Sequence, residues 1–175
     1  VDVQAFWEDY FASAGKDYPV TVTVLFTGQT QSGCGLASSA TGPFYCPADR
    51  KVYLDTDFFA ELQNRFGASG DFARAYVIAH EFGHHVQDAL GIMGEVSSQQ
   101  QSDPSNANAL SIRLELQADC LAGVWAHSIW ANPDSPEVES IPEKNVQDAI
   151  NAAEAVGDDR IQQQATGTID RESWT

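Results

Sequence analysis

Residues 72–90 read FARAYVIAHEFGHHVQDAL. Apolar side chains recur in this stretch every three or four residues, which predicts an amphipathic helix that ends at Gly91. Within it, His80, Glu81 and His84 form an HExxH pattern. On a helix, His80 and His84 differ by about 40° in azimuth and about 6 Å along the axis, so both imidazoles can bind one cation. Glu81 lies about 100° around the helix from His80, where it can reach a water bound to that cation without being a ligand.

The HExxH pattern is typical of catalytic zinc, which has three protein ligands and keeps one coordination position open for water. The third ligand has to come from elsewhere in the chain. Zinc peptidases with a third histidine carry glycine three residues and histidine six residues after the second histidine of the pattern. Those positions hold Gln87 and Leu90 here, so that subclass is excluded. The remaining common ligand is a glutamate from a second helix.

A second helix is predicted over residues 107–130 and carries an acidic pair, Glu115 and Asp119, one turn apart. We expect Glu115 to complete a ligand shell of two histidines and one glutamate. We expect Asp119 to accept the other ring N–H of a ligand histidine. The alternative is an acidic pair on the surface, which the apolar neighbours Leu114, Ala118 and Leu121 make less natural. His85 lies off the ligand face of the first helix and is expected to be a polar or supporting residue.

The rest of the pattern predicts an α+β fold in a single domain over residues 1–175. Further helices are expected at residues 2–14, 57–66 and 142–156. Strands are expected at residues 20–26 and 51–55, in a small antiparallel or mixed sheet with hairpin connectivity. Residues 93–106 are polar and are expected to form a long exposed loop, a candidate lid over the site. Strand 51–55 is a candidate edge strand for binding an extended peptide, and an ordinary sheet strand explains it equally well.

Two of the three cysteines, Cys34 and Cys46, lie in a Gly/Ser-rich segment. A disulfide between them would close a loop of about a dozen residues and contribute roughly 3 kcal/mol of stability. Such a bond belongs to an oxidising compartment, and the alternative is a pair of reduced loop thiols. Cys120 lies in an apolar helical run, where a free cysteine is usually a small buried side chain.

The chain is acidic, with 9 Lys plus Arg against 25 Asp plus Glu and a formal net charge of −16. This charge repels phosphate backbones and anionic lipid headgroups, so nucleic acid is not an expected partner. The sequence contains no run of 18 apolar residues, so attachment to a membrane is expected only through an upstream anchor outside this chain. The chain starts without Met, so it is expected to be either a mature form or a chain truncated at one or both ends.

Three motifs together resemble the bacterial family of neutral zinc metallopeptidases. They are residues 80–87 (HEFGHHVQ), 113–123 (RLELQADCLAG) and 42–49 (GPFYCPAD). The resemblance spans roughly residues 34–174 and implies a zincin-like α+β fold in an extracytoplasmic domain, either secreted or membrane-anchored. It also implies one catalytic zinc ion held by His80, His84 and Glu115, with Glu81 as the base. Family members continue beyond Thr175 into a His-Gly segment, so a functional group is expected there.

The expected reaction is hydrolysis of a peptide bond in a peptide or protein substrate. Glu81 would take a proton from the attacking water and then protonate the leaving amine. The donor that stabilises the oxyanion stays open: His127, Tyr53, Tyr45 and Arg113 are candidates, and a structural or surface role explains His127 as well.

Two other functions are compatible with the pattern. One is a noncatalytic zinc-stabilised binding module, and the other is a zinc hydrolase of nonpeptide amides. Glu81 argues against the module, because a structural zinc site needs no carboxylate beside an open metal position. A substrate screen would separate the second alternative from a peptidase.

Overall fold

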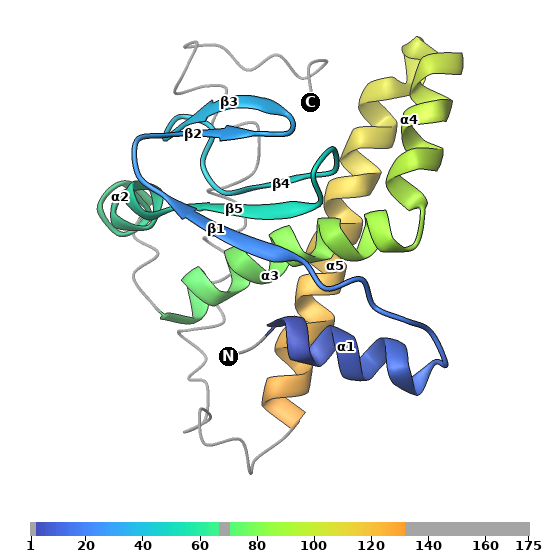
Figure 1. Cartoon of the computed structure of the whole chain (residues 1–175), viewed down its shortest axis with the longest axis horizontal. Coiled ribbons are helices and arrows are strands. Elements are labelled where there is room, and N and C mark those ends of the chain that lie inside the picture. The colour runs from blue at the N-terminus through green and yellow to red at the C-terminus, as the bar shows by residue number, and fades with distance from the viewer. Residues whose placement is uncertain (1–2, 67–70, 132–175) are drawn as a thin grey trace.

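The computed structural model describes residues 3–66 and 71–131 and has an α+β fold, as predicted (Figure 1). Its helices are α1 (Val3–Ser13), α2 (Thr56–Phe66), α3 (Asp71–Ala89), α4 (Ile92–Ser102) and α5 (Ala107–Ala131), with a short 3-10 helix η1 (Pro104–Asn106). Its strands are β1 (Val22–Phe26), β2 (Gln29–Ser32), β3 (Gly35–Ser38), β4 (Phe44–Cys46) and β5 (Lys51–Asp55). The helix expected at residues 142–156 lies outside the described residues.

The larger sheet has the strand order β1-β5-β4. β1 runs parallel to β5, with Val24 opposite Tyr53, whereas β4 runs antiparallel to β5, with Tyr45 opposite Val52. The expectation that residues 51–55 form an edge strand is therefore wrong. Residues 52–55 are all buried, because the run Val52-Tyr53-Leu54 is apolar on both faces, the pattern of a central strand. The edges of this sheet are β1 and β4.

The expected hairpin between residues 20–26 and 51–55 is also wrong, because these two strands are parallel neighbours. The segment between them, expected as a loop, forms β4 and the antiparallel hairpin β2–β3. β2 and β3 read QTQS and GLAS, which are too short and too polar to show an apolar alternation. β4 and β5 are joined by a turn at residues 47–50.

The main core lies between α1, the sheet and the helices α3 and α5. Its largest buried side chains include Trp7, Phe82 and Trp125, each no more than 6% exposed. α3 lies against the sheet, and α5 crosses α3 (Figure 1). Gly83 allows this close crossing, because a Cβ added there would lie 2.9 Å from the backbone oxygen of Ala118. The two helices predicted to carry the site are therefore in direct contact.

Residues 93–106, expected as a loop and candidate lid, are mostly helical. α4 covers residues 92–102, and η1 follows. Met and Gln favour helices, whereas Pro104 ends α4, so propensity outweighs the polar composition here. α4 packs against α3 and α5, and Met93 contacts the main core, so this segment is part of the fold (Figure 1). Within the described ranges, no helix has both the length and the apolar character needed to cross a membrane.

Candidate metal centre

His80 and His84 from α3 meet Glu115 from α5 in one cluster. The Oε2 atom of Glu115 lies 3.2 Å from Nε2 of His80 and 3.4 Å from Nε2 of His84, and the two Nε2 atoms are 3.1 Å apart. Tetrahedral ligands at zinc distances of about 2.0–2.1 Å are separated by about 3.3–3.4 Å. The three atoms are thus spaced as ligands of one zinc-sized cation, and no other described group of His, Cys, Asp and Glu side chains meets the same criterion.

Asp119 holds the ring of His80 from the far side. Its Oδ1 lies 2.9 Å from Nδ1 of His80 and also accepts a hydrogen bond of 3.3 Å from the Tyr76 hydroxyl. A carboxylate only accepts, so Nδ1 of His80 carries the proton and Nε2 faces the cluster. Asp119 therefore lies where the sequence analysis expected a partner for a ligand histidine. Supporting contacts of this kind orient metal ligands and raise their basicity.

Gln87 plays the corresponding part for His84, a role that the sequence pattern did not predict. The Gln87 side chain is fully buried, and its amide nitrogen donates to the Leu114 carbonyl at 2.7 Å and to Oε1 of Gln117 at 3.0 Å. These bonds turn Oε1 of Gln87 toward Nδ1 of His84, 3.0 Å away, so Nε2 of His84 also faces the cluster. The available signal was its spacing, since a residue three positions after a ligand lies on the same helix face.

The cluster attracts positive charge. Burial alone would lower the pKa of His80, but hydrogen bonds to Asp119 and Glu115 outweigh it and raise this pKa to about 10. Burial also opposes charge on His84, yet the bond to Glu115 and the Glu81 charge raise its pKa above the ordinary value. Burial would raise the pKa of Glu115, but its two histidine partners hold it well below the usual range. The site is thus built to hold a cation, whether protons or a metal ion.

Glu81 is buried beside this cluster, with 4% of its surface exposed. Burial raises the pKa of its carboxyl group, against the opposing charges of His80 and His84. The backbone of Tyr45, in the edge strand β4, lowers this pKa and opposes the effect of burial. A buried carboxyl group with a raised pKa beside a metal site can accept a proton and return it near neutral pH.

None of the four candidate oxyanion donors points its side chain at the cluster of His80, His84 and Glu115. The hydroxyl of Tyr45 bonds Asp88 at 2.9 Å, and that of Tyr53 bonds Asp49 at 2.6 Å, so both are committed to carboxylates outside the cluster. Arg113 and His127 are exposed on α5. They lie about 200° and about 120° around the helix from Glu115 and therefore point off its ligand face. His85 is buried and bonds the Tyr45 hydroxyl and the Pro19 carbonyl, so it is not a ligand.

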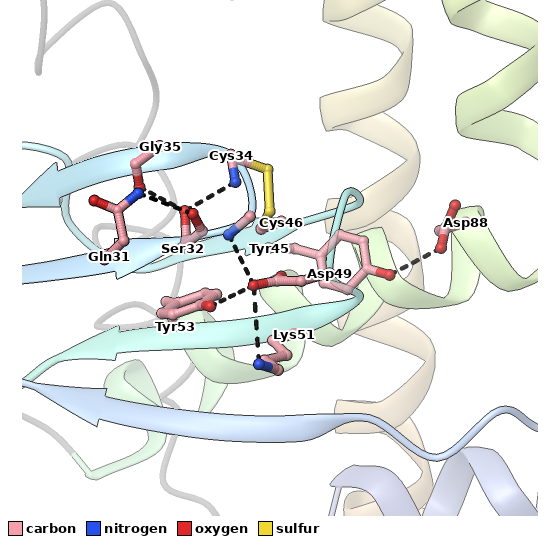
Figure 2. The surroundings of a disulfide bond; sticks show 11 residues. Gln31, Ser32, Cys34, Gly35, Tyr45, Cys46, Asp49, Lys51, Tyr53 and Asp88 are labelled. Atoms are coloured by element: carbon pink, nitrogen blue, oxygen red, sulfur yellow. Dashed lines mark hydrogen bonds and ion pairs between the residues drawn. A yellow bond between two sulfur atoms is a disulfide. The ribbon is translucent and has the colours of Figure 1, made fainter.

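The expected disulfide is present and joins Cys34 to Cys46 (Figure 2). It ties the tip of the β2–β3 hairpin to the end of β4. Asp49 adds a second tie, because its Oδ2 accepts bonds from the backbone N–H of Gly33 and the hydroxyl of Tyr53. A structural disulfide is typical of proteins that fold in oxidising compartments.

The expectation that Cys120 is buried is wrong, because this free cysteine is exposed. Leu116 and Val124, one turn away on either side in α5, are also exposed, at 61% and 37%. Apolar neighbours in the sequence therefore did not indicate burial on this face of the helix.

The chain is similar to known proteins over most of its length. The family model described as "Putative neutral zinc metallopeptidase" matches residues 1–175. The chain is 46% identical over 171 residues to "Uncharacterized protein YpfJ" of Escherichia coli K12, covering 97% of this chain and 57% of that protein. It is 52% identical over 156 residues to "Uncharacterized protein Rv2575" of Mycobacterium tuberculosis H37Rv, covering 86% of this chain and 52% of that protein.

The chain thus spans about half the length of the curated relatives it matches. No solved structure matches it. The family model covers the HExxH helix, the Glu115 helix and both disulfide cysteines in a single match. The chain therefore belongs to the putative neutral zinc metallopeptidase family.

Proposed function

We propose that this chain is the catalytic domain of a zinc-dependent endopeptidase with a zincin-like arrangement. One observation carries the proposal: His80, His84 and Glu115 converge at ligand spacing, with the buried carboxyl group of Glu81 beside them. Two imidazoles and one carboxylate form a known ligand set of catalytic zinc. A structural site would use a fourth protein ligand, and the described residues place none with these three.

The chemistry is divided between the metal and the protein. A zinc ion bound there would polarise the substrate carbonyl and lower the pKa of a water. His80 and His84 would hold the ion through Nε2, while Asp119 and Gln87 keep their other nitrogens protonated. Glu81 takes the proton from the attacking water and delivers it to the leaving nitrogen. Its burial supports this role, because a raised pKa lets one carboxyl group act as base and then as acid.

The edge strand β4 supports a peptide as the substrate. β4 is an edge of the larger sheet and contacts α3, the helix that carries Glu81 and both histidines. An extended peptide that pairs with this edge of β4 would run past Glu81 and the metal ligands. Main-chain pairing also suits a substrate whose side chains vary. A nonpeptide amide would gain nothing from a strand edge at this place.

The disulfide supports a location outside the cytoplasm. Cytosolic thiols are kept reduced, so a structural bond between Cys34 and Cys46 is expected to form in an oxidising compartment. We therefore infer that the domain acts on peptides or proteins in an extracytoplasmic compartment.

The test is to load the protein with zinc and to measure cleavage of a diverse peptide library by wild type and Glu81→Gln. We expect both proteins to bind zinc, and the variant to cleave at least about 100-fold more slowly, the usual loss on removing a general base. Glu95→Gln, an exposed position in α4, is the matched control and should cleave like wild type. The proposal fails if zinc-loaded wild type cleaves no peptide; a screen of nonpeptide amides would then test the remaining hydrolase.

A further inference from the structure

Tyr76 lies on α3 one turn before His80 and contacts the carboxylate that holds this histidine. The Tyr76 hydroxyl lies 3.3 Å from Oδ1 of Asp119 and 3.4 Å from the backbone carbonyl oxygen of the same residue. The same Oδ1 lies 2.9 Å from Nδ1 of His80. A carboxylate oxygen can accept two hydrogen bonds, so Oδ1 can accept from His80 and from Tyr76 together. Asp119, on α5, is therefore bonded by two side chains of α3.

The Tyr76 hydroxyl has one proton to donate, and Oδ1 of Asp119 is its stronger acceptor. Oδ1 is the nearer of the two oxygens and belongs to a carboxylate. The carbonyl oxygen of Asp119 lies within α5, where it accepts the N–H four residues later in the helix. Burial and the charge of Asp119 raise the pKa of Tyr76 above its ordinary value, so the hydroxyl keeps its proton and stays a donor.

The carboxylate of Asp119 is not enclosed by packing alone. Its side chain is 38% exposed, whereas that of His80 is 16% exposed. Water can therefore compete with His80 for this carboxylate and favour other rotamers of Asp119. The ring of Tyr76, in contrast, packs against the main core, so its hydroxyl approaches Asp119 from a fixed position. The tyrosine thus supplies a donor that solvent does not supply in one defined orientation.

The support for the other ligand histidine is built in the same way, with the helices exchanged. Gln87, on α3, lies 3.0 Å from Nδ1 of His84 and donates to the Leu114 carbonyl of α5 at 2.7 Å. Asp119, on α5, bonds the first histidine and accepts from Tyr76 of α3. Each ligand histidine therefore has a hydrogen-bond partner that is itself bonded to the opposite helix.

We propose that Tyr76 is a positioning residue, whose hydroxyl fixes the carboxylate of Asp119 and through it the ring of His80. Without the hydroxyl, the Asp119 side chain turns more freely toward water, and Nε2 of His80 is aimed less well at the metal. Among the described residues this hydroxyl bonds Asp119 alone, so its effect on the metal passes through that residue. The role rests on the zinc site of the proposed function and is independent of peptide hydrolysis.

The test measures zinc affinity by chelator competition in wild type, Tyr76→Phe, Asp119→Ala and the double variant. Tyr76→Phe keeps the ring and should weaken zinc binding about three- to tenfold, part of what one hydrogen bond to a charged group contributes. In the Asp119→Ala background the same change should alter affinity less than about twofold, because its target is gone. Tyr53→Phe is the matched control: its hydroxyl bonds a carboxylate, that of Asp49, and it should bind zinc like wild type.

Cobalt, which accepts the same ligands as zinc, gives a second measurement, because its visible absorption spectrum depends on the coordination geometry. The spectrum should change in Tyr76→Phe and match wild type in Tyr53→Phe. Wild-type zinc affinity in Tyr76→Phe, or an equal loss with and without Asp119, would overturn the proposal. If zinc-loaded wild type cleaves no peptide, the peptidase assignment fails, and the affinity comparison still decides the role of Tyr76. If Tyr76→Phe does not fold, Tyr76→Met serves instead and should lose affinity only where Asp119 is present.

Discussion

Gly83 lies directly against the backbone of Ala118 where α3 crosses α5. A Cβ added to Gly83 would lie 2.9 Å from the carbonyl oxygen of Ala118 and 3.2 Å from its Cα. Gly83 is flanked by His84 in α3, and Ala118 lies between Glu115 and Asp119 in α5. This contact therefore sets the distance between the histidine half and the carboxylate half of the metal cluster.

Gly83→Ala should push the two helices apart, because a backbone carbonyl cannot move aside as a flexible side chain can. We expect the free energy of unfolding to fall by about 1–3 kcal/mol, as in other overpacked cores. Zinc affinity should fall about tenfold or more. Urea denaturation and chelator competition measure the two effects.

Gly123→Ala is the matched control for this change. An added Cβ at Gly123, in α5, meets no atom within 4 Å, so stability should stay equal or rise by roughly 0.5–1 kcal/mol. If Gly83→Ala binds zinc as tightly as Gly123→Ala, the helix crossing does not set the cluster.

Gln87→Met should weaken zinc binding although Gln87 is not a ligand. Methionine keeps the shape but removes the oxygen that holds Nδ1 of His84 and the nitrogen that bonds the Leu114 carbonyl. Loss of such a supporting contact typically lowers metal affinity about 10–100-fold. Gln101→Met is the control, because Gln101 is exposed and its amide donates to Ser97 within α4. Equal zinc affinities in the two variants would remove Gln87 from the support of the site.

Zinc binding should release protons and strengthen as pH rises. The hydrogen bonds to Asp119 and Glu115 outweigh burial and raise the pKa of His80 to about 10 in the metal-free protein. At pH 7.5 this ring therefore carries a proton that zinc must displace. One displaced proton corresponds to about a tenfold gain in affinity per pH unit below that pKa.

Calorimetry at pH 7.5 in two buffers with different protonation enthalpies counts the released protons. Asp119→Asn weakens one of the two hydrogen bonds that raise the pKa of His80, so it should release fewer protons than wild type. The same shift affects the metal-free fold. The pKa of His80 in the folded protein lies above the ordinary value of 6.5. Protonation of His80 therefore stabilises the metal-free fold fully below pH 6.5, and this stabilisation is lost as pH rises through about 10. Zinc binding without proton release would contradict both statements.

Glu115→Ala should lower zinc affinity far more than Asp49→Ala does. Glu115 supplies the oxygen that faces both Nε2 atoms, whereas Asp49 bonds Gly33 and Tyr53 near the disulfide. Both variants lose one carboxylate and one unit of charge, so a general electrostatic effect would appear in both. Chelator competition distinguishes them, and equal affinities would show that Glu115 is not a ligand.

Local spacing predicted the parts of the site that lie within single helices. The HExxH spacing placed His80 and His84 on one face of a helix, and the spacing of Glu115 and Asp119 did the same for the second helix. The pairing of the strands was predicted less well, because it depends on contacts between distant segments. The apolar run at residues 52–54 is typical of a central strand, but the identity of its neighbours β1 and β4 depends on contacts outside residues 51–55.

Two further errors have the same physical origin. The polar segment 93–106 was expected to be a loop, but tertiary packing against α3 and α5 supports α4. The pattern around Gln87 shows only that a glycine is absent there, because the function of Gln87 depends on the Leu114 carbonyl, which lies on α5. In both cases the deciding partner lies on another element, and a pattern within one element does not contain it.

The disulfide should stabilise the fold by an amount that loop closure predicts. Cys34 and Cys46 are separated by 12 positions, for which the entropy of the unfolded chain gives roughly 3 kcal/mol. The double variant Cys34→Ser and Cys46→Ser should lose about that much free energy of unfolding. Cys120→Ser, at an exposed free cysteine, should lose almost none. Native wild type should react with one equivalent of a thiol reagent, because only Cys120 is free. A second reactive thiol would show that the Cys34–Cys46 bond is not fully formed. If a reductant leaves the free energy of unfolding unchanged, the bond is not a structural constraint.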